Sequence, residues 1–244
     1  MKYIKKLVIM MIPVMFLAGC SSASIDTKNV SKEAIERNTM TKVQSDVNVI
    51  MNKSYDYVLQ NMGSPYSTIY SLKVDNIDKF KNLKEISDKD MNNVEILSEG
   101  LLYPKYTSDY KLDGSALYIA LKDDKVSEVE TCDFKNLDVA LLMDEEANAV
   151  ISVYNDYNSL NENNIDKDNL DTYIGKEKNS ISSITKNKKC QYSVYIEADG
   201  GIDIDIYNIK DSNFLVIAYK NNEITYIAQR DGSKIAAAIQ KNIN

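Results

Sequence analysis

Apolar residues recur at helical spacing along three stretches of the chain. Over residues 43–62 they fall three or four positions apart, which is typical of an amphipathic helix, and Gly63 ends the pattern. The same spacing covers residues 136–157 and recurs around Leu170. We therefore expect two long helices and a short third helix that ends at Gly175.

Apolar and polar residues alternate along the segments that we expect to form β-strands. Two of these segments are hairpins, each with a polar turn between two alternating arms. Two further strands flank a Gly-Gly turn, and a short helix follows the last hairpin. The hairpins are expected at residues 115–131 and 214–228, the strands at 192–196 and 202–206, and the helix at 235–239.

The two expected hairpins match each other without a gap at an offset of 98 residues. Leu117 falls on Leu215, and the apolar positions on both sides of the turn also coincide. Upstream, Gly63 matches Gly175 at an offset of 112 residues. We interpret the match as a tandem duplication. The alternative is a chance similarity between two amphipathic hairpins, because strand patterns are short.

The first twenty residues carry the features of a secretion signal. A basic start precedes an apolar stretch over residues 7–18, which is shorter than the roughly 20 residues that a membrane-spanning helix needs. The segment Leu17-Ala18-Gly19-Cys20 resembles the bacterial lipobox, and this resemblance implies cleavage ahead of Cys20 and acylation of its thiol. The alternative is an ordinary secretory leader with a chance Cys at its end.

The lipobox determines the expected location of the protein. Two acyl chains on Cys20 give durable membrane residence, whereas a single chain binds only marginally. We therefore expect a lipid-anchored protein on the extracytoplasmic side of the cell membrane. The abundance of Lys, Asn, Ile and Tyr is similar to that of low-GC Gram-positive proteins and suggests a Gram-positive plasma membrane.

These features together predict an α+β fold of two related units, each a helix followed by an antiparallel β-sheet that ends in a hairpin. Val58 and Met62-Gly63-Ser64-Pro65 precede the first hairpin, and Leu170 and Ile174-Gly175 precede the second. This order resembles the small domains of the BamE/SmpA lipoproteins and the β-lactamase-inhibitor-protein-like fold, which implies binding to other proteins. The expected division is a lipoprotein signal peptide at 1–19, a lipidated flexible tether at 20–40, a first unit at 41–134 and a second unit at 135–244.

Charge and composition exclude several classes of partner and reaction. With 36 acidic and 29 basic side chains the net charge is −7, which disfavours nucleic acid as a partner. The chain has no His, so Ser-His-Asp and Cys-His catalytic sets and His-ligated zinc are absent. Asp203 and Asp205 alternate with Ile and are expected on a solvent face, and no Trp is present to line a sugar cleft. We expect no enzyme, no cofactor and no metal site.

Tyrosine is the one over-represented residue type, with 17 Tyr against 4 Phe. Several Tyr gather between the first helix and the first hairpin, and Tyr is enriched where proteins bind one another. The alternative is that Tyr replaces Phe in strands, with a buried ring and a hydrated hydroxyl. The candidate binding face consists of Tyr66, Tyr70, Tyr103, Tyr106 and Tyr110.

Two cysteines remain once Cys20 carries lipid. Cys132 ends the first unit and Cys190 lies at the start of the first strand of the second unit. Outside the cell they either form a disulfide or stay two separate buried thiols.

The predicted function is that of a non-catalytic protein-binding module in the cell envelope. Its expected partners are the membrane, through the lipid on Cys20, and an envelope protein. The alternative is a lipoprotein that captures or senses a small ligand or cell-wall fragment between its two units.

Overall fold

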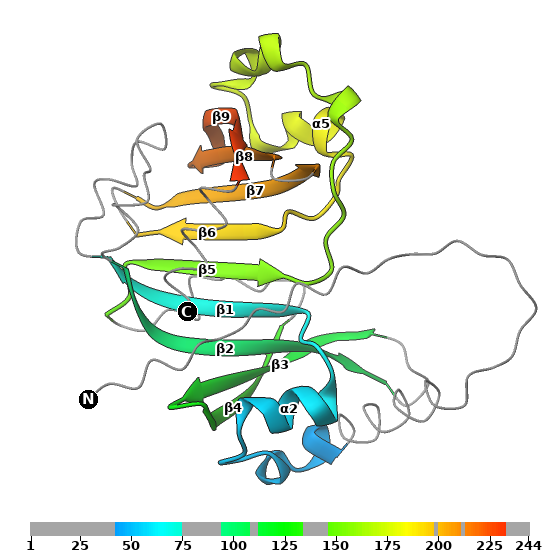
Figure 1. Ribbon diagram of the computed structural model, residues 1–244, viewed down its shortest axis with the longest axis vertical. Helices are drawn as coiled ribbons and strands as arrows, with labels where there is room; N and C mark the ends of the chain where they lie inside the picture. Colours follow the sequence, from blue (N-terminus) through cyan, green and yellow to red (C-terminus); the bar gives the residue numbers. More distant parts are fainter. Residues whose placement is uncertain are drawn as a thin grey trace, which may run out of the picture.

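The protein is built around one antiparallel sheet of nine strands (Figure 1). The computed structural model describes residues 42–74, 94–107, 112–133, 146–197, 200–210 and 213–232. The spatial order of the strands is β4-β3-β2-β1-β5-β6-β7-β8-β9, so the chain fills one half of the sheet outward and then returns to the centre. The strands are β1 (Ser67–Val74), β2 (Val94–Tyr106), β3 (Leu112–Lys122), β4 (Lys125–Asp133), β5 (Ala149–Tyr154), β6 (Tyr192–Ile196), β7 (Ile202–Lys210), β8 (Asn213–Lys220) and β9 (Glu223–Asp231).

The expected α+β fold of two helix-plus-sheet units is wrong. β1 pairs with β5 over six residues, from Ser67 opposite Tyr154 to Leu72 opposite Ala149, so the sheet continues through the expected boundary without a break. The described helices are short and lie near the two ends of the sheet (Figure 1). They are a helical turn at residues 42–45, η1 (Val47–Val49), α2 (Tyr55–Met62), η4 (Glu162–Asn164), η5 (Lys167–Tyr173), η6 (Lys178–Ile181) and α5 (Ser182–Thr185).

The expected long helix over residues 43–62 is divided by polar capping residues. The Asp46 side chain accepts a hydrogen bond from the Asn48 backbone N–H at 3.0 Å, which starts η1. Asn52 has a positive φ of 60°, and the Ser54 hydroxyl then caps α2. Side chains of Asp, Asn and Ser compete with helix hydrogen bonds, so they favour caps over helix interiors. The apolar spacing was therefore that of three short helical segments, residues 42–45, η1 and α2.

The last part of the expected helix over residues 136–157 is also wrong, because it forms the central strand β5. Ala149, Val150 and Ile151 are all buried, so the strand lacks the polar alternation that identifies a half-exposed strand. Residues 134–145 lie outside the described residues, as does the expected terminal helix at 235–239. The expected short helix around Leu170 is present as the 3-10 helix η5.

Both expected hairpins are confirmed, as are the strands β6 and β7. Asp123 and Asp124 form one turn and Asn221 and Asn222 the other, all four with φ between 51° and 66°. Two successive residues with positive φ are typical of the type I′ turn, whose twist matches that of the flanking strands.

The two hairpins also share an irregularity. A bulge follows Ala120 in β3 and Ala218 in β8. A hydroxyl bonds to the carbonyl oxygen at each bulge, from Ser127 to Ala120 at 3.2 Å and from Thr225 to Ala218 at 3.3 Å. The correspondence at an offset of 98 residues therefore includes backbone geometry as well as apolar pattern.

The residue of the first half that corresponds to Gly175 is not Gly63, as the sequence suggested, but a residue that precedes α2. The Asn52 N–H donates to the Val126 carbonyl at 3.0 Å, and the Gly175 N–H donates to the Ile224 carbonyl at 2.8 Å. The structural counterpart of Gly175 is therefore Asn52, and the expected match with Gly63 is wrong. Counted from these residues, α2 corresponds to the continuous segment formed by η6 and α5.

The helices form two caps on the sheet, the α2 cap (η1 and α2) and the α5 cap (η5, η6 and α5), and the two caps pack on opposite faces. Directly paired residues of neighbouring antiparallel strands point to the same face, and the pairs connect Ile119 on β3 to Val216 on β8. We call this the α2 face, because Ile119 packs with Val58 of α2. Ile217 points to the other face and packs with Ile184 of α5, so we call that the α5 face.

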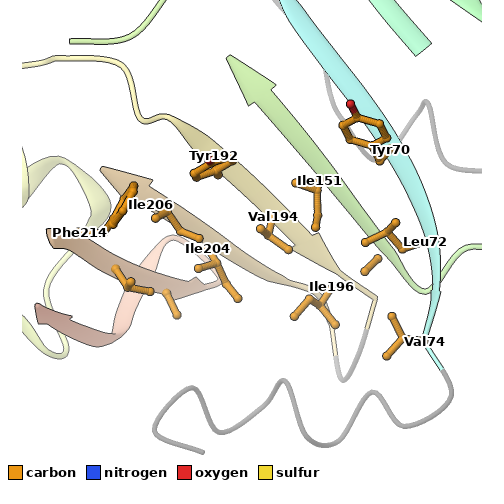
Figure 2. Packing of buried hydrophobic residues seen from close by; sticks show 13 residues of the cluster. Tyr70, Leu72, Val74, Ile151, Tyr192, Val194, Ile196, Ile204, Ile206 and Phe214 are labelled. Atoms are coloured by element: carbon orange, nitrogen blue, oxygen red, sulfur yellow. The ribbon is translucent and has the colours of Figure 1, made fainter. Parts of the chain in front are cut away.

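Three clusters of buried apolar side chains make up the described core. One lies under η1 and α2 at the β2–β4 end, and a second lies under η5, η6 and α5 at the β7–β9 end. The third occupies the middle of the α2 face, where side chains of β1, β5, β6, β7 and β8 project to one side of the sheet (Figure 2). Apolar burial therefore extends across the whole width of the sheet.

Candidate functional site

The candidate tyrosine face is not assembled among the described residues. Tyr70 is buried in the central cluster, and Tyr103 is buried under α2, where its hydroxyl donates to the Gly63 carbonyl at 2.8 Å. Tyr66 is half-buried and meets Tyr154 edge-on, with ring centroids 6.0 Å apart. The side chain of Tyr106 and the whole of Tyr110 lie outside the described residues. For Tyr70 and Tyr103 the alternative interpretation, buried strand residues, is the one that the structure supports.

The two cysteines are free thiols, so of the two alternatives the structure supports separate thiols rather than a disulfide. Cys132 lies on the edge strand β4, whereas Cys190 lies two residues before the start of β6, which is five strands away in the sheet. At about 4.8 Å per strand the separation is roughly 24 Å, far beyond the reach of a disulfide. Their distance in the sheet could not be read from the sequence, because it depends on where β5 inserts.

We expect the mass of the alkylated protein to be the same with and without prior reduction. Each of Cys132 and Cys190 should take one alkyl group after unfolding, because neither thiol is consumed by a disulfide. Intact-mass spectrometry of protein trapped with iodoacetamide in denaturant measures this directly. Two extra alkyl groups that appear only after reduction would contradict the structure.

A row of polar side chains crosses the α5 face between the centre of the sheet and the α5 cap. Ser152 on β5, Ser193 on β6 and Asp205 on β7 are directly paired with one another across their strands. Asp205 is only 5% exposed, although alternation with Ile predicted a solvent position. Asp203, on the same strand face, is exposed. The difference arises because η6 covers the sheet beside Asp205 and leaves Asp203 open.

Asp205 is held by a charged partner from the cap. Its carboxylate accepts a hydrogen bond from the Ser193 hydroxyl at 3.2 Å and forms a 2.9 Å ion pair with the Lys178 ammonium of η6. The same ammonium lies 4.4 Å from the centroid of the Tyr219 ring. A buried carboxylate without a partner would be strongly destabilising, so Lys178 both neutralises Asp205 and fixes η6 on the sheet. Because Lys178 and Asp205 are 27 residues apart in the sequence, the sequence pattern did not predict their ion pair.

A second cation of this region is enclosed by aromatic rings. The Lys189 ammonium lies 3.2 Å from the ring centroid of Tyr66 and 4.2 Å from that of Tyr154. It is buried and has no hydrogen-bond partner among the described residues. Burial lowers the pKa of Lys189 to about 8. The π faces of the two rings supply the main electrostatic stabilisation of the charge, and no sequence signal distinguished Lys189 from the neighbouring lysines.

Cys190 completes this polar cluster, which we define as Lys178, Lys189, Cys190, Asp205 and Tyr219. Burial, and then the Asp205 carboxylate, raise the pKa of the Cys190 thiol to about 12. Burial likewise raises the pKa of the Tyr219 hydroxyl. Both groups therefore stay protonated near neutral pH, and a protonated thiol is a poor nucleophile. The polar cluster therefore has the character of a structural contact that joins the α5 cap to the sheet.

The described residues contain neither a metal cluster nor a membrane span. No three His, Cys, Asp or Glu side chains among them are close enough together to hold a metal ion. No helix within the described ranges combines the length and the apolar character needed to cross a bilayer.

Comparison of the chain with protein-family models, with curated proteins and with solved structures found no match. The resemblances to the lipobox, to the BamE/SmpA domains and to the β-lactamase-inhibitor-protein-like fold therefore stay predictions.

Proposed function

We propose that this protein is a membrane-anchored extracytoplasmic lipoprotein, held by lipid on Cys20, that acts as a non-catalytic protein-binding module in the cell envelope. The observation that carries the proposal is the pair of terminal strands of the sheet. In the described part of the chain no strand lies beyond β4 or beyond β9. Such edges offer backbone donors and acceptors to an extended chain.

In the described part of the chain, other segments pair with each edge strand through backbone hydrogen bonds only at its start. The segment before α2 contacts the start of β4 through a bridge between Ser54 and Lys125, and the segment before η6 contacts the start of β9 through a bridge between Glu177 and Glu223. The remaining residues of both strands meet no further described strand. These lengths of edge are the surfaces on which we place partner binding.

The polar cluster supports the non-catalytic part of the proposal. Asp205 is engaged by Lys178 and Ser193, and the pKa of the Cys190 thiol is raised, so these groups do not provide an ionised nucleophile with a neighbouring base. Their buried contacts instead fasten the cap to the sheet.

The alternative function, capture of a small ligand between two units, loses its structural basis. It required a boundary between the two units. The continuous pairing of β1 with β5 removes that boundary.

Lipid anchoring is tested on the intact chain in its own cell. We expect the Cys20→Ser variant to move from the membrane fraction to the soluble fraction, because the thiol that receives the lipid is gone. Immunoblotting of the two fractions measures this shift. A matched control, Cys132→Ser, should stay with the membrane. Equal distribution of Cys20→Ser and the unmodified protein would contradict the lipid anchor.

Protein binding is tested by photocrosslinking in living cells. A photoreactive residue replaces Thr131 on the edge of β4 or Gln229 on the edge of β9, and a control replaces Asp56 on the exposed side of α2. We expect one dominant protein to be captured from at least one edge position and not from the control. If neither edge position yields a protein while the variants are found at the membrane, the protein-binding proposal fails.

A further inference from the structure

The outer side of β4 has backbone groups aimed away from the sheet. Val126 exchanges two backbone hydrogen bonds with the segment before α2: it accepts from Asn52 at 3.0 Å and donates to Lys53 at 2.9 Å. Its peptide groups therefore point away from β3. Val129 and Thr131 lie on the same face of the strand as Val126, because they pair with Ile119 and Leu117 as Val126 pairs with Leu121. In an extended strand, residues on one face direct their peptide groups to the same side.

Within the described residues, these peptide groups of Val129 and Thr131 meet no other strand, since β4 ends the sheet. The bulge at Ser127 separates them from the covered start of the strand. They therefore provide two outward N–H donors and two outward C=O acceptors, spaced as an antiparallel or parallel neighbour requires. This is the arrangement that β-strand addition uses.

The side chains beside this edge are acidic. Glu128 and Glu130 are exposed, and both point to the α5 face, where they pair with Ala120 and Tyr118 of β3. The pKa of Tyr118 is raised to about 12, first by burial and then by these two carboxylates. Burial, and then Glu130, also raise the pKa of Cys132. The shifts in both groups reflect a negative field along the α5 side of β4.

An aromatic ring lies next to the two carboxylates. The Tyr118 ring crosses directly over Gly100 of β2, where a Cβ would lie only 2.1 Å from a ring carbon. Gly100 therefore lets the ring lie flat across the neighbouring strand. The ring therefore points away from the β4 edge and leaves the carboxylates of Glu128 and Glu130 as the groups that a Lys or Arg side chain of a neighbouring strand would meet.

The opposite edge lacks this charge pattern. On β9, Arg230 lies among the edge residues and donates from its Nε to the Tyr226 hydroxyl at 2.9 Å. The positive charge of Arg230 would repel a basic partner at this edge. The two edges therefore share the same strand geometry but differ in the partner that they attract.

A second copy of the chain is a poor occupant of the β4 edge. Antiparallel self-pairing through Val129 would set Glu128 of one copy opposite Glu130 of the other, and like charges placed directly opposite are destabilising. The net charge of −7 adds to this repulsion. A neighbouring strand with basic side chains at alternate positions would instead place them beside Glu128 and Glu130.

We propose that the β4 edge binds an extended segment of a partner protein by strand addition, and that Lys or Arg at alternate positions of this segment pair with Glu128 and Glu130. This inference rests on the proposed function, because it names the partner chemistry of one of its two edges. Backbone hydrogen bonds to Val129 and Thr131 supply the register, and the two carboxylates select the basic segment.

The test uses the full-length protein and two synthetic nine-residue peptides. One alternates Thr with Lys, and the other has Glu at each Lys position. Fluorescence anisotropy measures their affinities, and we expect the Lys peptide to bind at least about tenfold more tightly, with the difference shrinking as salt is added. Hydrogen exchange followed by NMR should show slower exchange of the Val129 and Thr131 amides when the Lys peptide is present.

Two matched pairs of variants assign the binding to this edge. The E128K/E130K variant should reverse the preference between the peptides, whereas E162K/E197K, with the same change in net charge at exposed positions elsewhere, should keep it. Thr131→Pro removes an outward N–H and should abolish binding, whereas Gln229→Pro on β9 should not. Circular dichroism of each variant checks that the sheet is intact.

Equal affinity for the two peptides, or binding that leaves the Val129 and Thr131 amides unchanged, would overturn the inference. Slow exchange of these amides before any peptide is added would also overturn it, since another segment of the same chain would then occupy the edge. Capture of a protein only from the β9 position, without peptide binding at β4, rejects the β4 edge and keeps the protein-binding module. Peptide binding without any captured partner in cells counts against the proposed function instead.

Discussion

We expect Leu117→Ala and Leu215→Ala each to lower the free energy of unfolding by about 2–5 kcal/mol. The two leucines are at most 1% exposed and occupy equivalent positions at opposite ends of the sheet. Each substitution leaves a cavity in a different core cluster. Because the sheet is continuous through β1 and β5, both variants should unfold in one transition, displaced to lower urea concentration. Urea titration followed by circular dichroism measures the displacement.

Two exposed apolar residues provide controls for these truncations. Val47 is 37% exposed and Ile174 is 47% exposed, so their replacement by Ala should cost no more than about 0.5 kcal/mol. A curve with two separate transitions, of which Leu117→Ala moves one and Leu215→Ala the other, would show that the ends of the sheet unfold independently. That result would contradict the account of a single cooperative sheet.

The second large effect concerns Glu99, whose carboxyl lies on the α2 face of β2 opposite Tyr70 of β1. Burial raises the pKa of Glu99 to about 7, and the nearby Asp124 carboxylate adds to the shift. Its Oε1 has no hydrogen-bond partner among the described residues. The Asp124 carboxylate and the hydroxyls of Tyr55, Tyr70 and Tyr118 are titratable groups that interact electrostatically with Glu99.

The direction of the pH effect follows from this raised pKa. The folded protein binds the proton more tightly than the unfolded chain, in which the pKa of Glu99 returns to about 4.5. The contribution to stability is therefore complete below pH about 4.5 and is lost as the pH rises to about 7. At 1.36 kcal/mol per pH unit the loss is on the order of 3 kcal/mol. Glu99→Gln keeps the neutral shape, so it should escape this loss and be more stable than the unmodified protein at pH 8.

Chemical denaturation of both proteins between pH 5 and pH 8 measures the difference. Other carboxyl groups titrate in both proteins, so the informative quantity is the gap between the two curves, which should widen over this range. Glu95→Gln, at an exposed position of the same strand, is the control and should follow the unmodified protein. A constant gap between Glu99→Gln and the unmodified protein at all pH values would exclude Glu99 as the titrating group.

The hairpins were predictable because their information is local. Asp123-Asp124 and Asn221-Asn222 favour positive φ, so each turn identifies the two strands that it joins, even though β8 is buried on both faces. Strands β1 and β5 lack a local signal of this kind, and nearly all of their residues are buried on both faces. A continuous apolar run is compatible with a helix as well as a buried strand, and only the pairing with neighbours decides between them.

The polar cluster was not predictable for a related reason. Asp205 follows a strand pattern that places it on one face, but the pattern does not say whether a cap covers that face. Lys178 supplies the covering charge from a distant part of the sequence. The tyrosine count indicated an unusual composition, but only the sheet shows that Tyr70 and Tyr103 are buried. Strand alternation thus predicts on which face of the sheet a side chain lies, but it does not predict whether other elements bury that side chain.

The position of β5 has a consequence for the symmetry of the molecule. Because β1 and β6 are each antiparallel to β5, they run parallel to each other, and the strands on either side of β5 follow in mirrored order. A half-turn about the axis of β5 therefore carries one end of the sheet onto the other and exchanges its two sides. In the described residues each side therefore carries helices at one end, and the two groups of helices lie at opposite ends of the sheet. The single central strand β5 therefore lies on the approximate twofold axis that relates the two ends of the sheet.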